Sequence, residues 1–297
     1  MTNRNYDVAV VGAGVFGAWT AHALQDAGLK VLLVDAYGAA HARSSSGGES
    51  RVIRAGYGAD EIYTRWALRS LPLWRDLFER ASHPELFQPT GVLWLAREGD
   101  TLVAQTFATL QKFPARVEQL ARDELERRYT QFDFGKVAWA MLEHESGALL
   151  ARRAVQEAVR EATARGVEYM LASAAAPSGK GRAGVVKTSD GEALSAAHFV
   201  FACGAWLPKL FPDVLGERIP PTRQEVFYFR APAGDPRFRP PAMPVWVDFG
   251  AEVYGIPDLE SRGVKLALDR HGASFDPDAG ARVTSVETLA EVRRYVA

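Results

Sequence analysis

The 297-residue chain has little of what marks several protein classes. Its one cysteine, Cys203, excludes an internal disulfide framework and fits a reducing compartment. The formal net charge of −1 gives no general attraction to nucleic acid or to acidic membranes. No run approaches the roughly 20 apolar residues of a membrane-spanning helix, and the N-terminus lacks the pattern of a secretory signal. We therefore expect a cytoplasmic protein without a nucleic-acid or membrane partner.

The first motif lies in "YDVAVVGAGVFGAWTAHALQDAGLKVLLVD", whose pattern predicts a strand, a glycine turn, a helix and a second strand. Gly12, Gly14 and Gly17 have the G-x-G-x-x-G spacing, which permits a tight turn, close approach of a pyrophosphate and close helix–strand packing. Asp35 ends the second strand, where an acid can accept a hydrogen bond from a ribose hydroxyl. The unit predicts a dinucleotide site rather than a chance glycine turn, and it does not distinguish NAD from FAD.

The second motif is "SSSGGESRVIRAGYG", which places Arg51 and Arg54 one helical turn apart after a run of serines and glycines. The residues around the two arginines are apolar or small, which is unusual for a solvated charge run. We interpret the pair as a site for an anion. The alternative is a structural ion pair with Glu49 or Asp60.

The segments that follow alternate between helical and strand-like patterns. Residues 61–80 predict a helix whose large apolar residues belong to the core: Trp66, Trp74, Leu77 and Phe78. A polar helical stretch is expected over 101–129, broken at Pro114, and an amphipathic helix over 151–166. Strand-like runs separated by proline-rich loops indicate a largely antiparallel sheet, with runs at 225–230, 244–249, 253–256 and 264–268.

These patterns define an interleaved α/β organisation. We expect a Rossmann-like nucleotide-binding domain assembled from residues 1–80 and 145–215. A second, α+β domain would comprise residues 81–144 and 216–297 and be built on the antiparallel sheet. The chain has no internal repeat and no low-complexity tract.

In order and spacing, several motifs resemble the flavin-dependent amine oxidases of the D-amino-acid oxidase superfamily. Within it they are similar to the branch of monomeric sarcosine oxidase and N-methyltryptophan oxidase. The resemblance extends over all 297 residues and rests on "VVGAGVFG", "SRVIRAGYG", "TGVLWL", "ESGALLARRAVQEAV", "ACGAWLPKL", "PTRQEVFYF", "VYGIP" and "GVKLALDRHG". It implies FAD as the cofactor, a small-molecule amine or amino-acid substrate, O2 as the acceptor, and a monomer.

The resemblance also implies roles for the second motif. The segment containing Ser44 and Ser45 would wrap FAD, Arg51 would lie against the flavin ring, and Arg54 would bind the substrate carboxylate. A guanidinium suits this last role because it can make two parallel hydrogen bonds to a carboxylate. Gly204 would pack near the cofactor, beside Cys203, which we interpret as a small buried residue.

Two residues in the later strands match active-site positions of the family. Tyr254 matches a tyrosine of the substrate pocket, although an ordinary half-buried strand tyrosine would look the same in sequence. Lys265 matches the lysine that lies over the flavin and activates O2. It stands in an otherwise apolar strand, where a lysine is costly unless it points into a site or to water on the solvent face of an edge strand.

The sequence departs from the family pattern in two respects. Asp269 and Gly47 occupy positions where the sarcosine oxidases have histidines, so the amine need not be sarcosine and Asp269 could favour a more cationic substrate. The chain also stops inside a helix that starts at a Thr284…Glu287 capping box. The family's closing C-terminal FAD segment does not follow, so we expect a truncated version of the fold.

The function that follows is FAD-dependent oxidation of a secondary amine, most simply an N-methyl amino acid, to an aldehyde, a primary amine and H2O2. One alternative is a truncated flavin-binding protein without activity. The other is an amino-acid dehydrogenase that passes electrons to a carrier instead of O2.

Overall fold

The computed structural model describes residues 6–177 and 184–296. A five-stranded sheet at one end of the molecule has the order β10-β11-β1-β2-β9. Its strands are β1 (Tyr6–Val11), β2 (Val31–Asp35), β9 (Glu168–Leu171), β10 (Val185–Lys187) and β11 (Ala193–Phe201). All neighbours pair in parallel except β10, which is antiparallel to β11. The N-terminal strand therefore lies in the middle of a mostly parallel sheet, as the dinucleotide-binding pattern requires.

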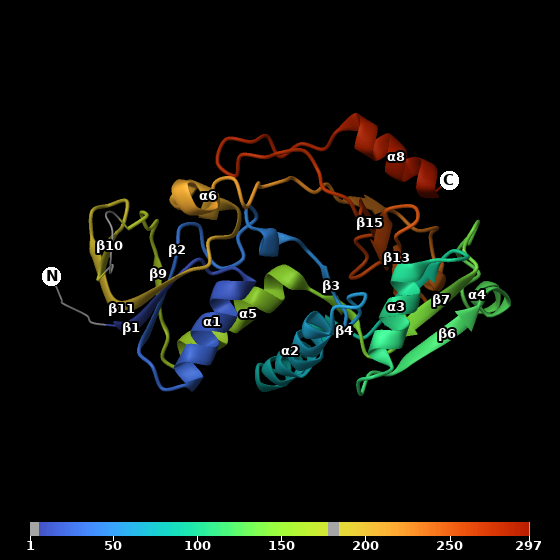
Figure 1. The fold of residues 1–297 in the computed structure, drawn as a ribbon, viewed down its shortest axis with the longest axis horizontal. Coiled ribbons are helices and arrows are strands. Elements are labelled where there is room, and N and C mark those ends of the chain that lie inside the picture. The colour runs from blue at the N-terminus through green and yellow to red at the C-terminus, as the bar shows by residue number, and fades with distance from the viewer. Residues whose placement is uncertain (1–5, 178–183, 297) are drawn as a thin grey trace.

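A seven-stranded sheet at the other end has the order β12-β15-β14-β13-β5-β7-β6 (Figure 1). Its strands are β5 (Val92–Ala96), β6 (Val117–Ala121), β7 (Trp139–Glu143), β12 (Phe227–Phe229), β13 (Val245–Asp248), β14 (Val253–Ile256) and β15 (Val264–Leu268). Neighbours are antiparallel except β13 and β5, which pair in parallel. A third, antiparallel sheet comprises β3 (Arg51–Ile53), β8 (Gly147–Leu149) and β4 (Phe87–Gln88).

Helices cover both sheets. α1 (Val15–Asp26) and α5 (Ala151–Ala164) pack together beside the five-stranded sheet, and α2 (Glu61–Arg80) contacts α5. The seven-stranded sheet is covered by α3 (Thr101–Leu110), α4 (Arg122–Arg128) and α8 (Val286–Val296). Two short helices, α6 (Leu207–Leu210) and α7 (Pro212–Leu215), follow β11. The fold is α/β, as predicted, whereas the assignment of residue ranges to two domains stays a prediction.

Alternation along the strands of the seven-stranded sheet gives it two different faces. Val92, Trp94, Val247 and Ile256 belong to the large core shared with α1, α2 and α5. Their sequence neighbours point the other way, into a second core that includes Val292 of α8. Because side chains alternate with period two, strands β5, β7, β13 and β14 contribute to both cores.

Three details of the predicted elements were wrong. Trp66 is 58% exposed, although α2 has the predicted bounds and the other three large residues are buried. The stretch 101–129 is not one broken helix, because β6 lies between α3 and α4 and pairs with β7. The helix α8 is capped by Ser285 rather than Thr284, since the Ser285 hydroxyl accepts a hydrogen bond from the Thr288 amide at 3.1 Å.

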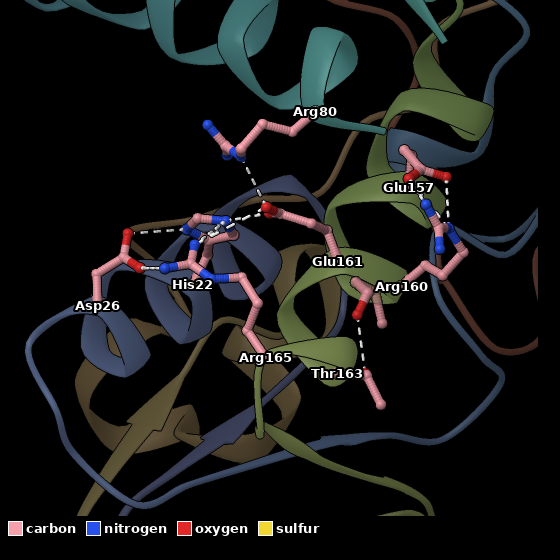
Figure 2. Close-up of polar contacts among 9 residues, drawn as sticks. His22, Asp26, Arg80, Glu157, Arg160, Glu161, Thr163 and Arg165 are labelled. Atoms are coloured by element: carbon pink, nitrogen blue, oxygen red, sulfur yellow. Dashed lines mark hydrogen bonds and ion pairs between the residues drawn. The ribbon is translucent and has the colours of Figure 1, made fainter. Parts of the chain in front are cut away.

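An ion cluster joins three helices and fixes α1, the helix that follows the glycine turn (Figure 2). His22 of α1 is 4% exposed and contacts Glu161 of α5 and Asp26 one turn along α1. Arg80 of α2 also donates to Glu161, at 2.9 Å. Burial opposes ionisation of Glu161, but the hydrogen bonds from Arg80 and His22 outweigh it and lower the pKa of this carboxyl.

Candidate functional site

The glycine turn between β1 and α1 is packed too closely for side chains. Gly12 has φ +107°, and a Cβ there would lie 2.4 Å from the carbonyl oxygen of Ala202 after β11. A Cβ on Gly17 would lie 1.7 Å from the carbonyl oxygen of Gly12. The first and third glycines thus allow the strand, turn and helix to approach one another, as the motif predicts.

The start of α1 fits a pyrophosphate. The N-cap residue, Gly14, has no side chain that could cap the helix. The first turn of this fully described helix contains no acidic residue. Of the early amides, that of Val15 donates to the Ser46 hydroxyl at 3.0 Å. An uncapped helix start presents backbone donors and a positive dipole end to an anion. From the sequence we singled out the serine run but assigned no role to Ser46, because only the fold brings the Ser46 hydroxyl to the start of α1.

Asp35 already has three backbone partners. Its carboxylate accepts hydrogen bonds from the amides of Ala13 at 2.7 Å, Tyr37 at 2.8 Å and Gly38 at 3.0 Å. The acid therefore ties the glycine turn to the loop after β2. Two carboxylate oxygens provide about four acceptor positions, so one remains for the ribose hydroxyl that we predict.

We expect Asp35→Ala to weaken FAD binding by about 1–3 kcal/mol, because the ribose loses a hydrogen-bond acceptor and the glycine turn loses the hydrogen bond from the Ala13 amide to Asp35. The measurement is a fluorescence titration with FAD, accompanied by thermal unfolding. Asp7→Ala is a matched control, since Asp7 accepts a hydrogen bond from the Lys30 amide at 2.7 Å at the far end of the same strands. An unchanged FAD affinity in Asp35→Ala would remove this residue from the ribose role.

Arg51, the first residue of β3, lies close to the serines at the start of η1 (Ser45–Gly47). The Arg51 guanidinium donates to the carbonyl oxygens of Ser50 at 3.0 Å and Ser45 at 2.8 Å. It makes no ion pair with any described residue, so the alternative of a partner at Glu49 or Asp60 does not hold. The Ser44 hydroxyl donates to the His41 carbonyl, and Gly204 begins η3 (Gly204–Trp206) with φ +51° and open space at its Cβ position.

One face of the seven-stranded sheet brings together residues that are far apart in the sequence. Tyr254 of β14 is in register with Val247 of β13, which is in register with Trp94 of β5. On β15, Lys265 is opposite Ile256 of β14, two positions along from Tyr254 and therefore on the same face. The face is the one that packs toward α1 and α5.

Lys265 is buried and forms no ion pair with a carboxylate of the described residues. Its side chain is 2% exposed, and its ammonium donates to the Ser50 carbonyl at 2.8 Å. Strand β12 covers β15 on its outer side, so the alternative of a lysine on the solvent face of an edge strand is wrong. Burial, with a smaller effect of Arg51, lowers the pKa of Lys265 to about 7. Lys265 also lines a cavity of about 330 Å³.

This pKa makes stability depend on pH. Between about pH 7 and pH 10 the unfolded chain keeps the Lys265 proton and the folded protein releases it, so folding is increasingly favoured as the pH rises. We expect the stability of the natural protein relative to Lys265→Met to rise by up to about 4 kcal/mol across this range. Urea unfolding of both proteins at several pH values measures the difference. A difference that does not vary with pH would show that Lys265 keeps an ordinary pKa.

Arg54 is half-buried and stacked on aromatic rings. Its guanidinium lies 4.5 Å from the ring centre of Tyr57 and 4.7 Å from that of Trp94, and it donates to the Gly56 carbonyl. No described carboxylate forms an ion pair with it, so the structural ion pair considered above is absent. Most of its five N–H donors remain available for an anion.

Two further predicted residues are Tyr254 and Asp269, and Arg51 influences the first of them. Tyr254 is half-buried, and burial raises the pKa of its hydroxyl despite the opposing charge of Arg51. Asp269 is exposed just after β15, and its charge also raises the pKa of Tyr254.

Cys203 is partly buried, and burial raises the pKa of its thiol to about 12, so it is inert as a nucleophile.

Comparison with known proteins identifies the family. Residues 7–296 match the model of the DAO family of FAD-dependent oxidoreductases. The chain is 31% identical to monomeric sarcosine oxidase of Bacillus sp. (strain B-0618) over 283 residues, 93% of this chain and 71% of the relative. It is 28% identical to N-methyl-L-tryptophan oxidase of Yersinia pestis (strain Pestoides F), covering 94% of this chain and 74% of the relative. The chain therefore belongs to the FAD-dependent oxidoreductase family and is a flavin enzyme by descent.

Solved structures share the fold at lower identity. Fructosyl peptide oxidase from E. terrenum matches with a TM-score of 0.80 and 19% identity, over 98% of this chain and 74% of that one. L-proline dehydrogenase from P. horikoshii matches with a TM-score of 0.78 and 18% identity, over 98% and 76%. The fold therefore accommodates both oxidases and dehydrogenases.

Among the described helices, none is long and apolar enough to cross a membrane, and no acid, histidine or cysteine cluster suited to a metal is present in that part of the chain.

Proposed function

We propose that the protein oxidises the C–N bond of a secondary amine that bears a carboxylate, most simply an N-methyl amino acid, with FAD as its flavin. The observation that supports this most is a pair of cations along one sheet face, neither of which forms an ion pair within residues 6–177 and 184–296. Arg54 lies over Trp94 of β5, and Lys265 is on β15, three strands from β5 at about 4.8 Å per strand. Tyr254 lies on the strand next to Lys265.

The bound flavin would accept a hydride equivalent from the carbon attached to the amine nitrogen and return the electrons to O2 as H2O2. The oxidised substrate is an imine, which water converts to an aldehyde and a primary amine. The protein supplies binding and electrostatics. Arg54 would hold the substrate carboxylate with two parallel hydrogen bonds, and Tyr254 would line the pocket beside it.

The residues near Lys265 would serve the oxygen half of the reaction. In its protonated form, below about pH 7, the buried Lys265 ammonium would stabilise negative charge on oxygen more strongly than a solvated ammonium does. Arg51, which lies close enough to influence Lys265, would contribute a second positive charge. For the dinucleotide, Gly12, Gly14, Gly17 and Asp35 would receive the pyrophosphate and ribose, with Ser44, Ser45 and Gly204 around them.

The dehydrogenase alternative keeps the same roles for Arg54 and Tyr254 but gives Lys265 no part with O2. The alternative of a flavin-binding protein without activity keeps only the nucleotide residues. We propose a monomer that acts on a small molecule, and size-exclusion chromatography with light scattering tests the monomer.

The test of the proposed function uses the full natural chain purified with FAD. We expect flavin absorbance near about 450 nm that is bleached anaerobically by an N-methyl amino acid and restored by air with release of H2O2. A panel of N-methyl amino acids, with the corresponding amines that lack the carboxylate, identifies the substrate. Binding of NAD without affinity for FAD, or a flavin that no amine bleaches, would contradict the proposal.

A further inference from the structure

Glu143, the last residue of β7, is a buried acid that the proposed function does not use. It is 3% exposed and forms no ion pair with any described residue. A buried carboxylate without a cation is costly unless hydrogen bonds satisfy its oxygens. Its placement therefore requires a physical explanation.

Four neutral donors satisfy this carboxylate. They are the backbone amides of Ala55 at 2.7 Å and Gly56 at 3.1 Å, the Trp94 indole at 2.7 Å and the Ser146 hydroxyl at 2.7 Å. Two carboxylate oxygens offer about four acceptor positions, so all of them are used. Glu143 thus has no acceptor left for the nearby arginine.

Three of the four donors belong to the surroundings of Arg54. The amides of Ala55 and Gly56 are those of the two residues that follow it, and the Gly56 carbonyl accepts from its guanidinium. The Trp94 indole is the ring over which the guanidinium lies. Arg54 and Glu143 also line one small cavity of about 30 Å³. One carboxylate therefore fixes both the backbone and the ring that determine where the guanidinium points.

We propose that Glu143 is a positioning residue that holds Arg54 for the substrate carboxylate. It supplies negative charge near the arginine while neutral donors occupy its oxygens, so the guanidinium keeps its own donors for the substrate. This inference rests on the proposed function of Arg54. A merely structural Glu143 would stabilise the sheet without affecting recognition of a carboxylate.

The test is Glu143→Gln. Glutamine has nearly the same shape as glutamate, but its amide N–H₂ group would face hydrogen-bond donors that now contact a carboxylate oxygen. Two measurements are combined. The first is the ¹⁵Nε–H resonance of Arg54 in the flavin-free protein, assigned by its loss in Arg54→Lys. The second is the KM of N-methylglycine, or of the best N-methyl amino acid of the panel, against that of the matching amine without a carboxylate.

We expect the resonance to show that the Arg54 side chain has become mobile. We also expect the KM of the acid to rise at least tenfold, while the KM of the amine stays within about twofold. Thr106→Val is the matched control. The Thr106 hydroxyl accepts from the Gly58 amide at 3.1 Å in the same loop and donates to the Leu102 carbonyl rather than to Glu143, so this variant should lower stability and leave both readouts unchanged.

An Arg54 resonance that stays rigid in Glu143→Gln, or a KM that rises equally for acid and amine, would overturn the proposal. If Glu143→Gln does not fold, Trp94→Phe removes the indole donor and keeps a ring under Arg54, and the same shift in KM, smaller in size, is expected. If no amine reduces the flavin, the proposed function fails, and the resonance alone decides the positioning role.

Discussion

Lys265→Met is expected to slow reoxidation of the reduced flavin by O2 by about 100-fold or more, with little change in anaerobic reduction by substrate. The first electron transfer to O2 forms superoxide, and a fixed positive charge in a site shielded from water stabilises that anion. Lys265 is 2% exposed, so its charge is poorly screened, and with a pKa of about 7 it carries that charge below about pH 7, where the two half-reactions should be compared. The rate loss corresponds to about 3 kcal/mol at the barrier. Stopped-flow absorbance of the two half-reactions separates them.

Lys187→Met is the control, because Lys187 is an exposed strand lysine of β10 at the far edge of the other sheet. Two results would contradict the oxygen role. Unchanged reoxidation in Lys265→Met would point to an acceptor other than O2, which favours the dehydrogenase alternative. Equal slowing of both half-reactions would indicate a general disturbance of the flavin site.

The second large effect concerns Arg54→Lys, which should retain flavin but raise the KM of an N-methyl amino acid at least tenfold. A lysine replaces two parallel hydrogen bonds with a single point contact, and it loses the stacking of a planar guanidinium on Tyr57 and Trp94. Because the contact is made in the ground state, kcat should change less than KM. Steady-state kinetics on the full natural chain measures both constants.

Arg65→Lys provides a matched comparison, since the Arg65 guanidinium also lies on a ring, 4.9 Å from that of Phe113, but at the surface. It should leave KM unchanged. Loss of folding in Arg54→Lys, or an equal KM effect on the amine without a carboxylate, would favour a structural role for Arg54.

Several elements could be predicted from the sequence because local interactions define them. The strand–glycine–helix–strand unit of residues 6–35 follows from periodicity and from the spacing of three glycines, and α2 begins and ends where its helical pattern does. Strands β14 and β15 also have the predicted bounds. Trp66 was misplaced because helical periodicity identifies an apolar residue but not whether another element covers it.

The sequence by itself therefore determined the class of protein, the nucleotide turn and the residue types suited to an amino-acid oxidase. Only the tertiary structure decided where these residues lie and what surrounds them. Lys265 is buried because the segment containing Ser50 lies over its ammonium, and a period of two cannot tell which face of a strand another element covers. The backbone after Arg54 donates to Glu143 through the Ala55 amide, a hydrogen bond that spans 88 positions and leaves no local signal. Such contacts arise when sheets pack, because the carboxylate's cost of burial is offset only by donors that distant strands bring to it.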